Sequence, residues 1–262
     1  MFNISIIQFA PVLGDPSQTR SNLDNLFRRI EGSDLVILPE LANSGYNFTS
    51  SKQAFDSSEA IGESSFIDFL TNWANKKNCL VVSGMNERAG DRLYNSSVLL
   101  GKKGLIGRYR KTHLFMNEKD FFSPGDEGFP VFEVNGIKIG MLICFDYLFP
   151  EAWRIMALQG AQIICHPSNL VTPYGERVVP VQAIINRFFV ATANRIGDEG
   201  NLSFRGNSLL ADPLGDILAQ APENEESLIR VSIDPGKAHD KMITGRNHVL
   251  NDRRPDIYRG LL

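Results

Sequence analysis

Three side chains that together could perform acyl transfer lie at the ends of three expected strands. Glu40 ends the apolar run 36–39, Lys111 follows the strand-like segment 104–110, and Cys144 ends the apolar run 140–143. Functional groups in open α/β sheets collect at the carboxyl ends of strands. A thiol can attack a carbonyl or nitrile carbon, a carboxylate can carry its proton to the leaving nitrogen, and an ammonium can stabilise the oxyanion. If the fold brings them together, these residues form a complete acyl-transfer site.

The segment around Cys144 is the most informative part of the chain. Its strand ends abruptly on the cysteine, and a helix with a proline in its first turn is expected to start at Pro150. A thiol near a helix N-terminus lies in a positive field that favours the thiolate. The alternatives are a small buried hydrophobe for Cys144, an exposed turn acid for Glu40 and a solvated strand-end lysine for Lys111. No single residue decides between these roles, but their combination favours the catalytic one.

Composition excludes several classes of partner. The chain has 262 residues, of which 43% are hydrophobic and 22% charged, with a formal net charge of −3 from 27 basic and 30 acidic residues. These values are typical of a soluble globular protein and give no basic field for nucleic acid. The sequence begins directly with an expected strand, shows no signal peptide and has no apolar run of membrane-spanning length. We therefore expect a small-molecule substrate, with no nucleic acid and no membrane as partner.

The cysteines indicate a reducing compartment. Cys79, Cys144 and Cys165 are an odd number in a long chain, which argues against a secreted disulfide framework and predicts a cytoplasmic protein. Cys165 is expected to be a buried strand cysteine and Cys79 to be inert. A zinc set drawn from His113, Cys144, Cys165 and His166 would lack the paired C-x-x-C spacing of a structural site. We therefore expect neither a metal nor a cofactor.

Single helices alternate with strands and hairpins along the chain, which predicts mixed α/β sheets with helices outside. Strands that are apolar on both faces must be covered on both faces, so two sheets stacked face to face are expected. The chain is interpreted as a single domain over 1–262, with a polar tail from about 237 that docks on the body or on a partner subunit. The expected helices are Ser17–Ile30, capped by Ser17, then Glu63–Lys77, Pro150–Gln159 and Pro180–Phe188.

Three segments resemble the signature segments of the nitrilase superfamily of carbon–nitrogen hydrolases. They are Leu38-Pro39-Glu40, Tyr109-Arg110-Lys111-Thr112-His113-Leu114, and Ile143-Cys144-Phe145-Asp146 with Phe149-Pro150-Glu151. Their order and spacing are similar too, and the likeness runs from Ile4 to about Ile233. Within the superfamily, the chain resembles the compact, stand-alone archaeal nitrilase-like hydrolases.

The resemblance implies a four-layer α-β-β-α sandwich that pairs with a second copy through helices near the nucleophile, giving a homodimer or a higher even homo-oligomer. It implies that Glu40 is the general base, Lys111 the oxyanion-stabilising cation and Cys144 the nucleophile. The backbone N–H of Phe145 would be the second oxyanion donor. Glu118, seven residues after Lys111, matches the position of a further glutamate that the family places near the site.

The substrate class is less sharply defined by the sequence. True nitrilases of the superfamily usually follow the cysteine with tryptophan and glutamate, whereas this chain has Phe145-Asp146, closer to amidases and carbamoylases. We therefore expect hydrolysis of a small linear amide or N-carbamoyl compound, with a small aliphatic nitrile as the alternative substrate and a non-catalytic binding protein as the alternative class. Tyr46, Asn169 and Arg177 are candidate substrate-binding residues, Arg177 as a bidentate partner for a carboxylate.

Overall fold

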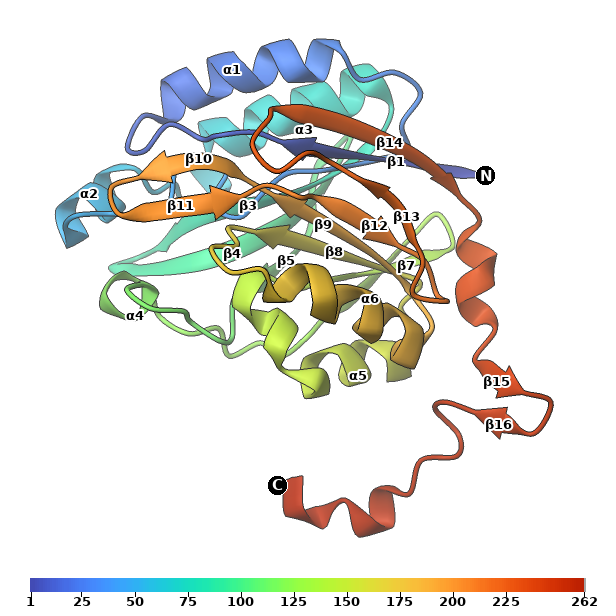
Figure 1. Ribbon diagram of the computed structural model, residues 1–262. Helices are drawn as coiled ribbons and strands as arrows, with labels where there is room; N and C mark the ends of the chain where they lie inside the picture. Colours follow the sequence, from blue (N-terminus) through green and yellow to red (C-terminus); the bar gives the residue numbers. More distant parts are fainter. Residues whose placement is uncertain (262) are drawn as a thin grey trace.

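The computed structural model describes residues 1–261 and contains two six-stranded sheets packed face to face (Figure 1). The first sheet has the order β14-β1-β2-β3-β4-β5, with bounds Ser227–Ile233, Phe2–Gln8, Leu35–Ile37, Leu80–Ala89, Arg92–Gly101 and Gly104–Arg110. The second has the order β13-β12-β9-β8-β7-β6, with bounds Ile217–Gln220, Leu209–Ala211, Phe189–Asn194, Ile163–Ser168, Ile137–Met141 and Val131–Val134.

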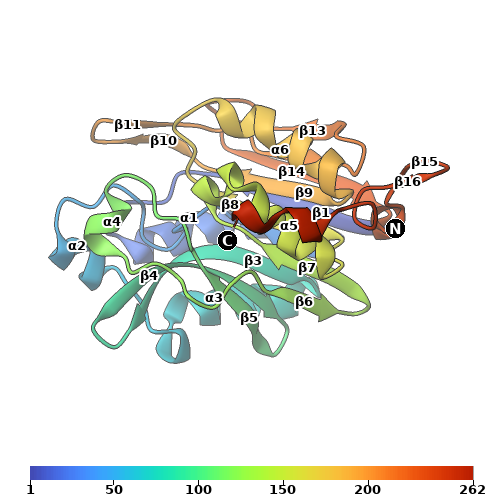
Figure 2. The ribbon, with the colours of Figure 1, turned by 90° about the horizontal axis from the view of Figure 1, so that it is seen from below.

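Helices cover the outer face of each sheet. Figure 1 and Figure 2 show α1 (Pro16–Arg28) and α3 (Ser65–Lys77) on one side of the sandwich, and α5 (Pro150–Leu158) and α6 (Tyr174–Asn186) on the other. This order of layers confirms the predicted α-β-β-α sandwich. The short helices are α2 and α4, at Ser51–Asp56 and Glu118–Phe121, and the 3-10 turns η1 to η5 are Ile61–Glu63, Cys144–Leu148, Pro235–His239, Pro255–Ile257 and Arg259–Leu261.

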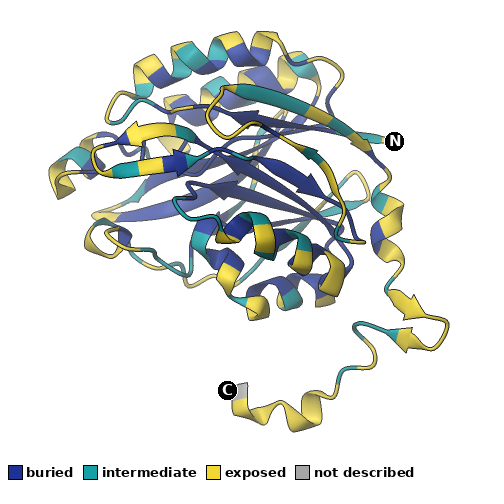
Figure 3. Cartoon of the chain, in the orientation of Figure 1, coloured by how far each residue is buried: buried dark blue, intermediate teal, exposed yellow. Residues whose placement is uncertain are grey.

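The alternation of side chains along the central strands explains the layers. In β2, Leu35 and Ile37 belong to the core between the two sheets, whereas Val36 packs on the opposite face with α1 and α3. All three are fully buried, and Figure 3 shows the central strands of both sheets as buried throughout. Each such side chain contributes about 1.5–3 kcal/mol on leaving water. Strands apolar on both faces thus require the covering layers that the structure has.

The strand directions bring three chain segments to one edge of the sandwich. β1, β2 and β3 are mutually parallel, and so are β7, β8 and β9. β5 is antiparallel to β4, which is antiparallel to β3, so β5 runs in the same direction as β3. The residues after β2, β5 and β7 therefore leave their sheets at carboxyl ends, where sites form in α/β folds.

The starts of α1, α3 and α6 differ from the sequence prediction, and α3 begins at Ser65 instead of Glu63 because Ser64 caps it. The carboxylate of Asp15, not Ser17, caps α1, because it accepts the backbone N–H of Gln18 at 2.9 Å while Pro16 occupies the first turn. α6 starts at Tyr174 and not at Pro180, which lies inside it. Proline favours the first turn of a helix because it has no N–H to donate, yet α6 continues through Pro180 with one intrahelical hydrogen bond fewer.

A hairpin outside the two main sheets was not predicted. Its strands are β10 (Ile196–Glu199) and β11 (Leu202–Arg205), which pair only with each other among the strands of residues 1–261. Each strand has only four residues, and β10 has no alternation of apolar and polar side chains, which explains why the sequence did not reveal the hairpin. The hairpin begins two residues after Asn194, and Figure 1 shows it at the same end of the sandwich as α2 and α4.

The tail after β14 leaves the sandwich, as Figure 1 shows, and carries the small pair β15 (Met242–Thr244) and β16 (Asn247–His248). It touches the body through a few polar contacts: Lys241 Nζ donates to the carbonyls of Asn186 and Arg187, and Arg154 donates to the carbonyl of Val249. Within residues 1–261, no helix has the length and apolar character needed to cross a membrane.

Candidate active site

Glu40 lies in a fully buried turn directly after β2. A Cβ added at Gly84 would lie 2.4 Å from the Cα of Glu40, so this close approach requires glycine on the neighbouring strand. Glu40 Oε1 accepts hydrogen bonds from Lys111 Nζ at 2.6 Å and from Asn95 Nδ2 at 2.7 Å. Its Oε2 is buried and has no hydrogen-bond partner among the described residues. Because an unpaired buried acceptor is costly, Oε2 is the atom available to receive a proton during a reaction.

Lys111 is the first residue after β5 and is held between two acids. Its ammonium lies 2.6 Å from Glu40 Oε1 and 2.7 Å from Glu118 Oε1, and all three side chains are almost completely buried. Burial alone would lower the pKa of Lys111, but the carboxylates of Glu118 and Glu40 outweigh it and raise that pKa. Lys111 is therefore a fixed positive charge in a site of low dielectric, where such a charge acts strongly on a developing oxyanion.

Glu118 begins α4 and faces the same ammonium. Its carboxylate also accepts the phenol of Tyr46 at 2.8 Å and the backbone N–H of Phe115 at 3.2 Å. Burial raises the pKa of Glu118 to about 7 against the opposing effect of Lys111. A carboxyl group with this pKa exchanges its proton near neutral pH, as an acid–base group in a site must.

Cys144 starts the 3-10 turn η2 in a strained backbone conformation. Its φ is 41°, in the left-handed region that non-glycine residues rarely adopt, and such strain clusters at functional sites. The thiol is buried, and the nearby backbone N–H of Asn169 acts to lower its pKa. The charges of Glu40, Lys111 and Glu118 all act on it. The structure thus brings the thiol, the ammonium and both carboxylates into one buried cluster.

The expected thiolate is not the resting form of Cys144. Burial and the Glu40 carboxylate raise the pKa of the thiol well above its ordinary value, although Lys111 lowers it. The N-terminus of α5 does not supply the expected field, because Cys144 lies six residues before Pro150, in a separate turn. A helix field fades within one turn, whereas burial and a neighbouring carboxylate act directly. Cys144 consequently needs a base to remove its proton, and Glu40 Oε2 is available.

His166 supports the strained turn from the next strand, β8. Its Nε2 lies 2.9 Å from the Cys144 carbonyl oxygen, and its Nδ1 lies 3.0 Å from Thr192 Oγ1. Burial lowers the pKa of His166 to about 4, so the ring is neutral at physiological pH. Because a carbonyl oxygen only accepts, the proton is assigned to Nε2, which donates to Cys144. The sequence around His166 does not indicate this contact, because its partner lies 22 residues away in the chain.

A cavity of about 120 Å³ opens above Cys144. Its walls are apolar, aromatic or neutral polar side chains, with Phe145 and Asn169 among them, and no charged side chain of the described residues lines it. Asn169 also donates from its side chain to the Glu40 carbonyl at 3.1 Å, while its Oδ1 has no partner among residues 1–261. The lining residues are Phe115, Cys144, Phe145, Tyr147, Leu148, Asn169, Leu170, Val171, Thr172 and Tyr174.

Two of the candidate substrate-binding residues lie outside this lining. Arg177 is exposed on α6, and the structure does not bring it to the cavity. Tyr46 is buried next to Glu118, and its hydroxyl donates a hydrogen bond to the Glu118 carboxylate. The unpredicted β10–β11 hairpin holds Tyr46 there, because Glu199 accepts the backbone N–H groups of Tyr46 and Asn47 at 2.9 and 2.7 Å.

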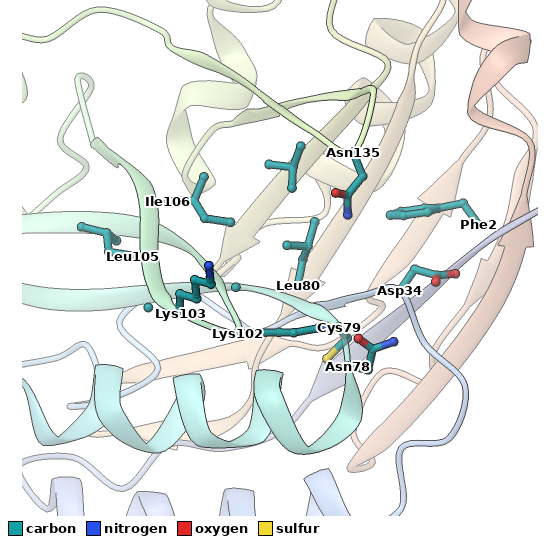
Figure 4. Close-up of a pocket in the computed structure, with 13 residues that line it drawn as sticks. Phe2, Asp34, Asn78, Cys79, Leu80, Lys102, Lys103, Leu105, Ile106 and Asn135 are labelled. Carbon is teal, nitrogen blue, oxygen red and sulfur yellow. The ribbon is translucent and has the colours of Figure 1, made fainter.

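The remaining thiols lie away from this cluster, and one of them borders a separate cleft. Burial raises the pKa of Cys165, and it raises that of Cys79 to about 11, so both are poor nucleophiles. Cys79 borders a cleft of about 510 Å³ at the opposite edge of the sandwich, where β2, β3 and β7 begin (Figure 4). Lys102, Lys103 and Asn135 also border it, and Asp34, another lining residue, raises the pKa of the Cys79 thiol further. Within residues 1–261, no group of three or more His, Cys, Asp and Glu side chains is arranged to hold a metal ion.

Comparison with known proteins identifies relatives over the whole chain. The profile of a family described as carbon–nitrogen hydrolase matches residues 3–240. A nitrilase of Pyrococcus abyssi is 41% identical over 260 residues, covering 98% of this chain and 99% of that protein. An N-carbamoylputrescine amidase of Solanum tuberosum is 30% identical over 292 residues, covering 100% of this chain and 95% of that protein.

The fold has solved counterparts as well. The crystal structure of an amidase from Nesterenkonia sp. superposes with a TM-score of 0.83 at 25% identity, covering 100% of this chain and 96% of that one. Sequence and structural similarity therefore both extend over the sandwich and over the segments that carry Glu40, Lys111 and Cys144.

Proposed function

This chain belongs to the carbon–nitrogen hydrolase family, and from that premise we propose that it hydrolyses small, uncharged, linear amides or N-carbamoyl compounds with release of ammonia. Membership makes it an enzyme, which sets aside the alternative of a binding protein that kept the fold. The observation that carries the proposal is the buried cluster of Glu40, Lys111 and Glu118 around the Cys144 thiol.

Acylation of Cys144 is the first half of the proposed reaction. Glu40 Oε2 takes the thiol proton as sulfur bonds to the amide carbon, and the oxyanion forms against the Lys111 ammonium and the backbone N–H of Phe145. Glu40 then gives the proton to the amide nitrogen, the C–N bond breaks and ammonia leaves. The product on the enzyme is a thioester on Cys144. The unpaired Oε2 of Glu40 supports its role as the proton carrier.

Water completes the cycle through the same groups. Glu40 removes a proton from water while the resulting hydroxide bonds to the thioester carbon, and Lys111 again faces the oxyanion. The intermediate collapses with cleavage of the C–S bond, the proton returns to sulfur and the carboxylic acid leaves. Glu118 contributes by holding Lys111 at 2.7 Å and by exchanging its own proton near neutral pH.

The cavity above Cys144 supports a small and uncharged substrate. Its volume of about 120 Å³ is far below the about 300–1,000 Å³ of pockets for drug-sized ligands. A substrate carboxylate or ammonium would lose its hydration there without gaining an opposite charge, since the lining among the described residues is neutral.

Nitrile hydrolysis is a second candidate, because the Pyrococcus abyssi protein that is 41% identical to this chain is a nitrilase. A nitrile would form a thioimidate on Cys144 before the thioester, through the same base and the same cation. The Phe145-Asp146 pair favours the amide.

A substrate panel read out by ammonia release tests the choice. We expect butyramide and malonamide to be hydrolysed, and malonamate, which matches malonamide in size but carries a charge, to have a kcat/KM at least about 100-fold lower. N-carbamoylputrescine should be equally poor because of its ammonium. The Cys144→Ala protein is the blank. Equal turnover of malonamide and malonamate would refute the uncharged class, and turnover of propionitrile without any amide would establish the nitrile alternative.

We further propose that residues 1–262 act as one domain that forms a homodimer or a higher even oligomer through α5 and α6. Both helices expose apolar side chains to solvent, and a groove of about 590 Å³ runs between them and the tail. Exposed apolar surface of this kind marks interaction sites. The exposed apolar side chains on the two helices are Ile155, Leu158, Val181, Ile184 and Ile185. The tail from about 237 would contribute Arg253 and Tyr258 from the groove wall.

A charge placed on this face should separate the subunits. We expect Ile155→Asp combined with Leu158→Asp to give a monomer in size-exclusion chromatography with light scattering, because two carboxylates would be buried without partners. Ile106→Asp is the matched control, since Ile106 is 41% exposed and Ile155 40%, but Ile106 lies on β5. A wild-type monomer, or a dimer that survives both α5 substitutions, would contradict this interface.

A cytoplasmic location is also proposed. The support is that all three cysteines are free and buried in the structure, which suits a reducing compartment.

A further inference from the structure

Asp146 lies two residues after Cys144, is completely buried and accepts four hydrogen bonds. Its Oδ2 accepts the backbone N–H of Ile143 at 2.9 Å and the phenol of Tyr109 at 2.8 Å. Its Oδ1 accepts the backbone N–H of His113 at 3.2 Å and lies 2.8 Å from His113 Nδ1. A buried carboxylate with this many donors is firmly held, because each charge-assisted bond is stronger than a neutral one.

The donors to Asp146 come from two catalytic segments. Ile143 precedes the nucleophile, while Tyr109 and His113 stand two residues before and two residues after Lys111. The Tyr109 hydroxyl also accepts the backbone N–H of Thr112 at 3.1 Å, which closes the loop around Lys111. The Asp146 carboxylate thus connects the turn that contains Cys144 to the segment that contains Lys111 through hydrogen bonds to both.

Aromatic side chains hold the ring of His113 in place beside Asp146. The His113 ring stacks on Phe149 with 3.5 Å between ring centroids and an interplanar angle of 7°. Phe129 stacks on His113 at 6.1 Å. The ring therefore presents Nδ1 to Asp146 in a defined direction, and the connection is rigid at both ends.

We infer that Asp146 is a positioning residue that sets the placement of the Lys111 ammonium relative to the Cys144 sulfur. This inference rests on the proposed reaction for its consequence on turnover. Asp146 does not line the cavity above Cys144, so it acts through the segments it joins and not through substrate. Its short side chain bonds to Ile143 three residues back, a reach that glutamate would alter. The Phe145-Asp146 pair therefore has a structural reason beside its value as a family marker.

Asp146→Asn tests the inference, with Asp212→Asn as the matched control. Asp212 is also a nearly buried aspartate that caps a turn, where it accepts the N–H groups of Leu214 and Asp216 at 2.8 and 3.1 Å, but it lies after β12. We expect Asp146→Asn to lower kcat for butyramide about 100-fold with KM changed less than about threefold, since a small misplacement of a catalytic group has this effect. Asp212→Asn should lower stability alone.

A second readout does not depend on amide turnover. The pH dependence of Cys144 alkylation by iodoacetamide reports the thiol, which Glu40, Lys111, Glu118 and Tyr46 face. Because Lys111 lowers the pKa of the thiol, a displaced ammonium should move the alkylation midpoint upward, by about one pH unit in Asp146→Asn. Asp212→Asn should leave it in place. If wild-type enzyme hydrolyses no amide, the proposed function fails, yet this midpoint still decides the role of Asp146.

Tyr109→Phe is a second test variant in case Asp146→Asn does not fold. It removes a single hydroxyl from the Asp146 contacts and should give a smaller shift in the same direction. An unchanged midpoint in both folded variants, or a loss of kcat in Asp146→Asn fully explained by the unfolded fraction, would overturn the inference. A shift in both, with kcat lowered and KM retained, would support it.

Discussion

Replacing Cys144 by alanine should abolish amide hydrolysis while leaving the fold intact. The proposed reaction has no route without the sulfur that bonds to the amide carbon, so we expect kcat/KM to fall by at least about 10⁴-fold. Loss of one small sulfur atom beside an open cavity removes little packing, and circular dichroism and the melting temperature should stay close to wild type. Ammonia release from butyramide measures the loss.

Two other cysteines provide the controls for this result. Cys79 and Cys165 are also buried and free, and Cys79→Ala and Cys165→Ala should retain activity within a few-fold, because neither thiol meets a base or a cation of the cluster. Residual activity above about one percent in Cys144→Ala, after contamination is excluded, would mean that another group attacks the substrate.

Lys111→Met should impair both activity and stability. The substitution keeps the length of the side chain but removes the charge that two buried carboxylates share. Leaving Glu40 and Glu118 without their cation should cost about 3–5 kcal/mol of unfolding free energy, as for other broken buried ion pairs. Loss of the oxyanion partner should lower kcat/KM by about 10³-fold. Urea denaturation and butyramide kinetics measure the two effects.

The two effects can be separated by a second substitution. Adding Glu118→Gln to Lys111→Met removes one of the stranded charges and should recover part of the stability, because the buried repulsion disappears. Activity should stay low, since the ammonium is still missing. If Lys111→Met were as stable as wild type and active within tenfold, Lys111 would be neither the ion-pair centre nor the oxyanion donor.

The sequence identified those site residues whose position depends only on the strand that precedes them. Glu40, Lys111 and Cys144 each follow an apolar or alternating strand, and strand ends converge in a sheet of this kind, so their meeting could be anticipated. The face-to-face sheets followed from strands apolar on both sides, as in β2. The alternation of apolar and polar side chains is a property of short segments, so it can be read directly from the sequence.

Features that depend on long-range packing were not accessible in this way. The resting form of Cys144 depends on burial and on the nearby Glu40, and local helix electrostatics gave the wrong sign. Tyr46 was expected to meet substrate, but Glu199, 153 residues away in the chain, holds it against Glu118. Nothing near Tyr46 in the sequence encodes that contact. Arg177 was also expected to bind substrate, but α6 starts at Tyr174 and leaves Arg177 exposed on the helix.

The acyl-enzyme itself gives the most direct test of the account. Enzyme turning over butyramide is quenched in acid during the first turnover and mapped by peptide mass spectrometry. We predict one butyryl group on the peptide that contains Cys144, removable by hydroxylamine, with the Cys79 and Cys165 peptides unmodified. A butyryl group on any other residue, or ammonia released in the first turnover with Cys144 never acylated, would contradict the thioester mechanism.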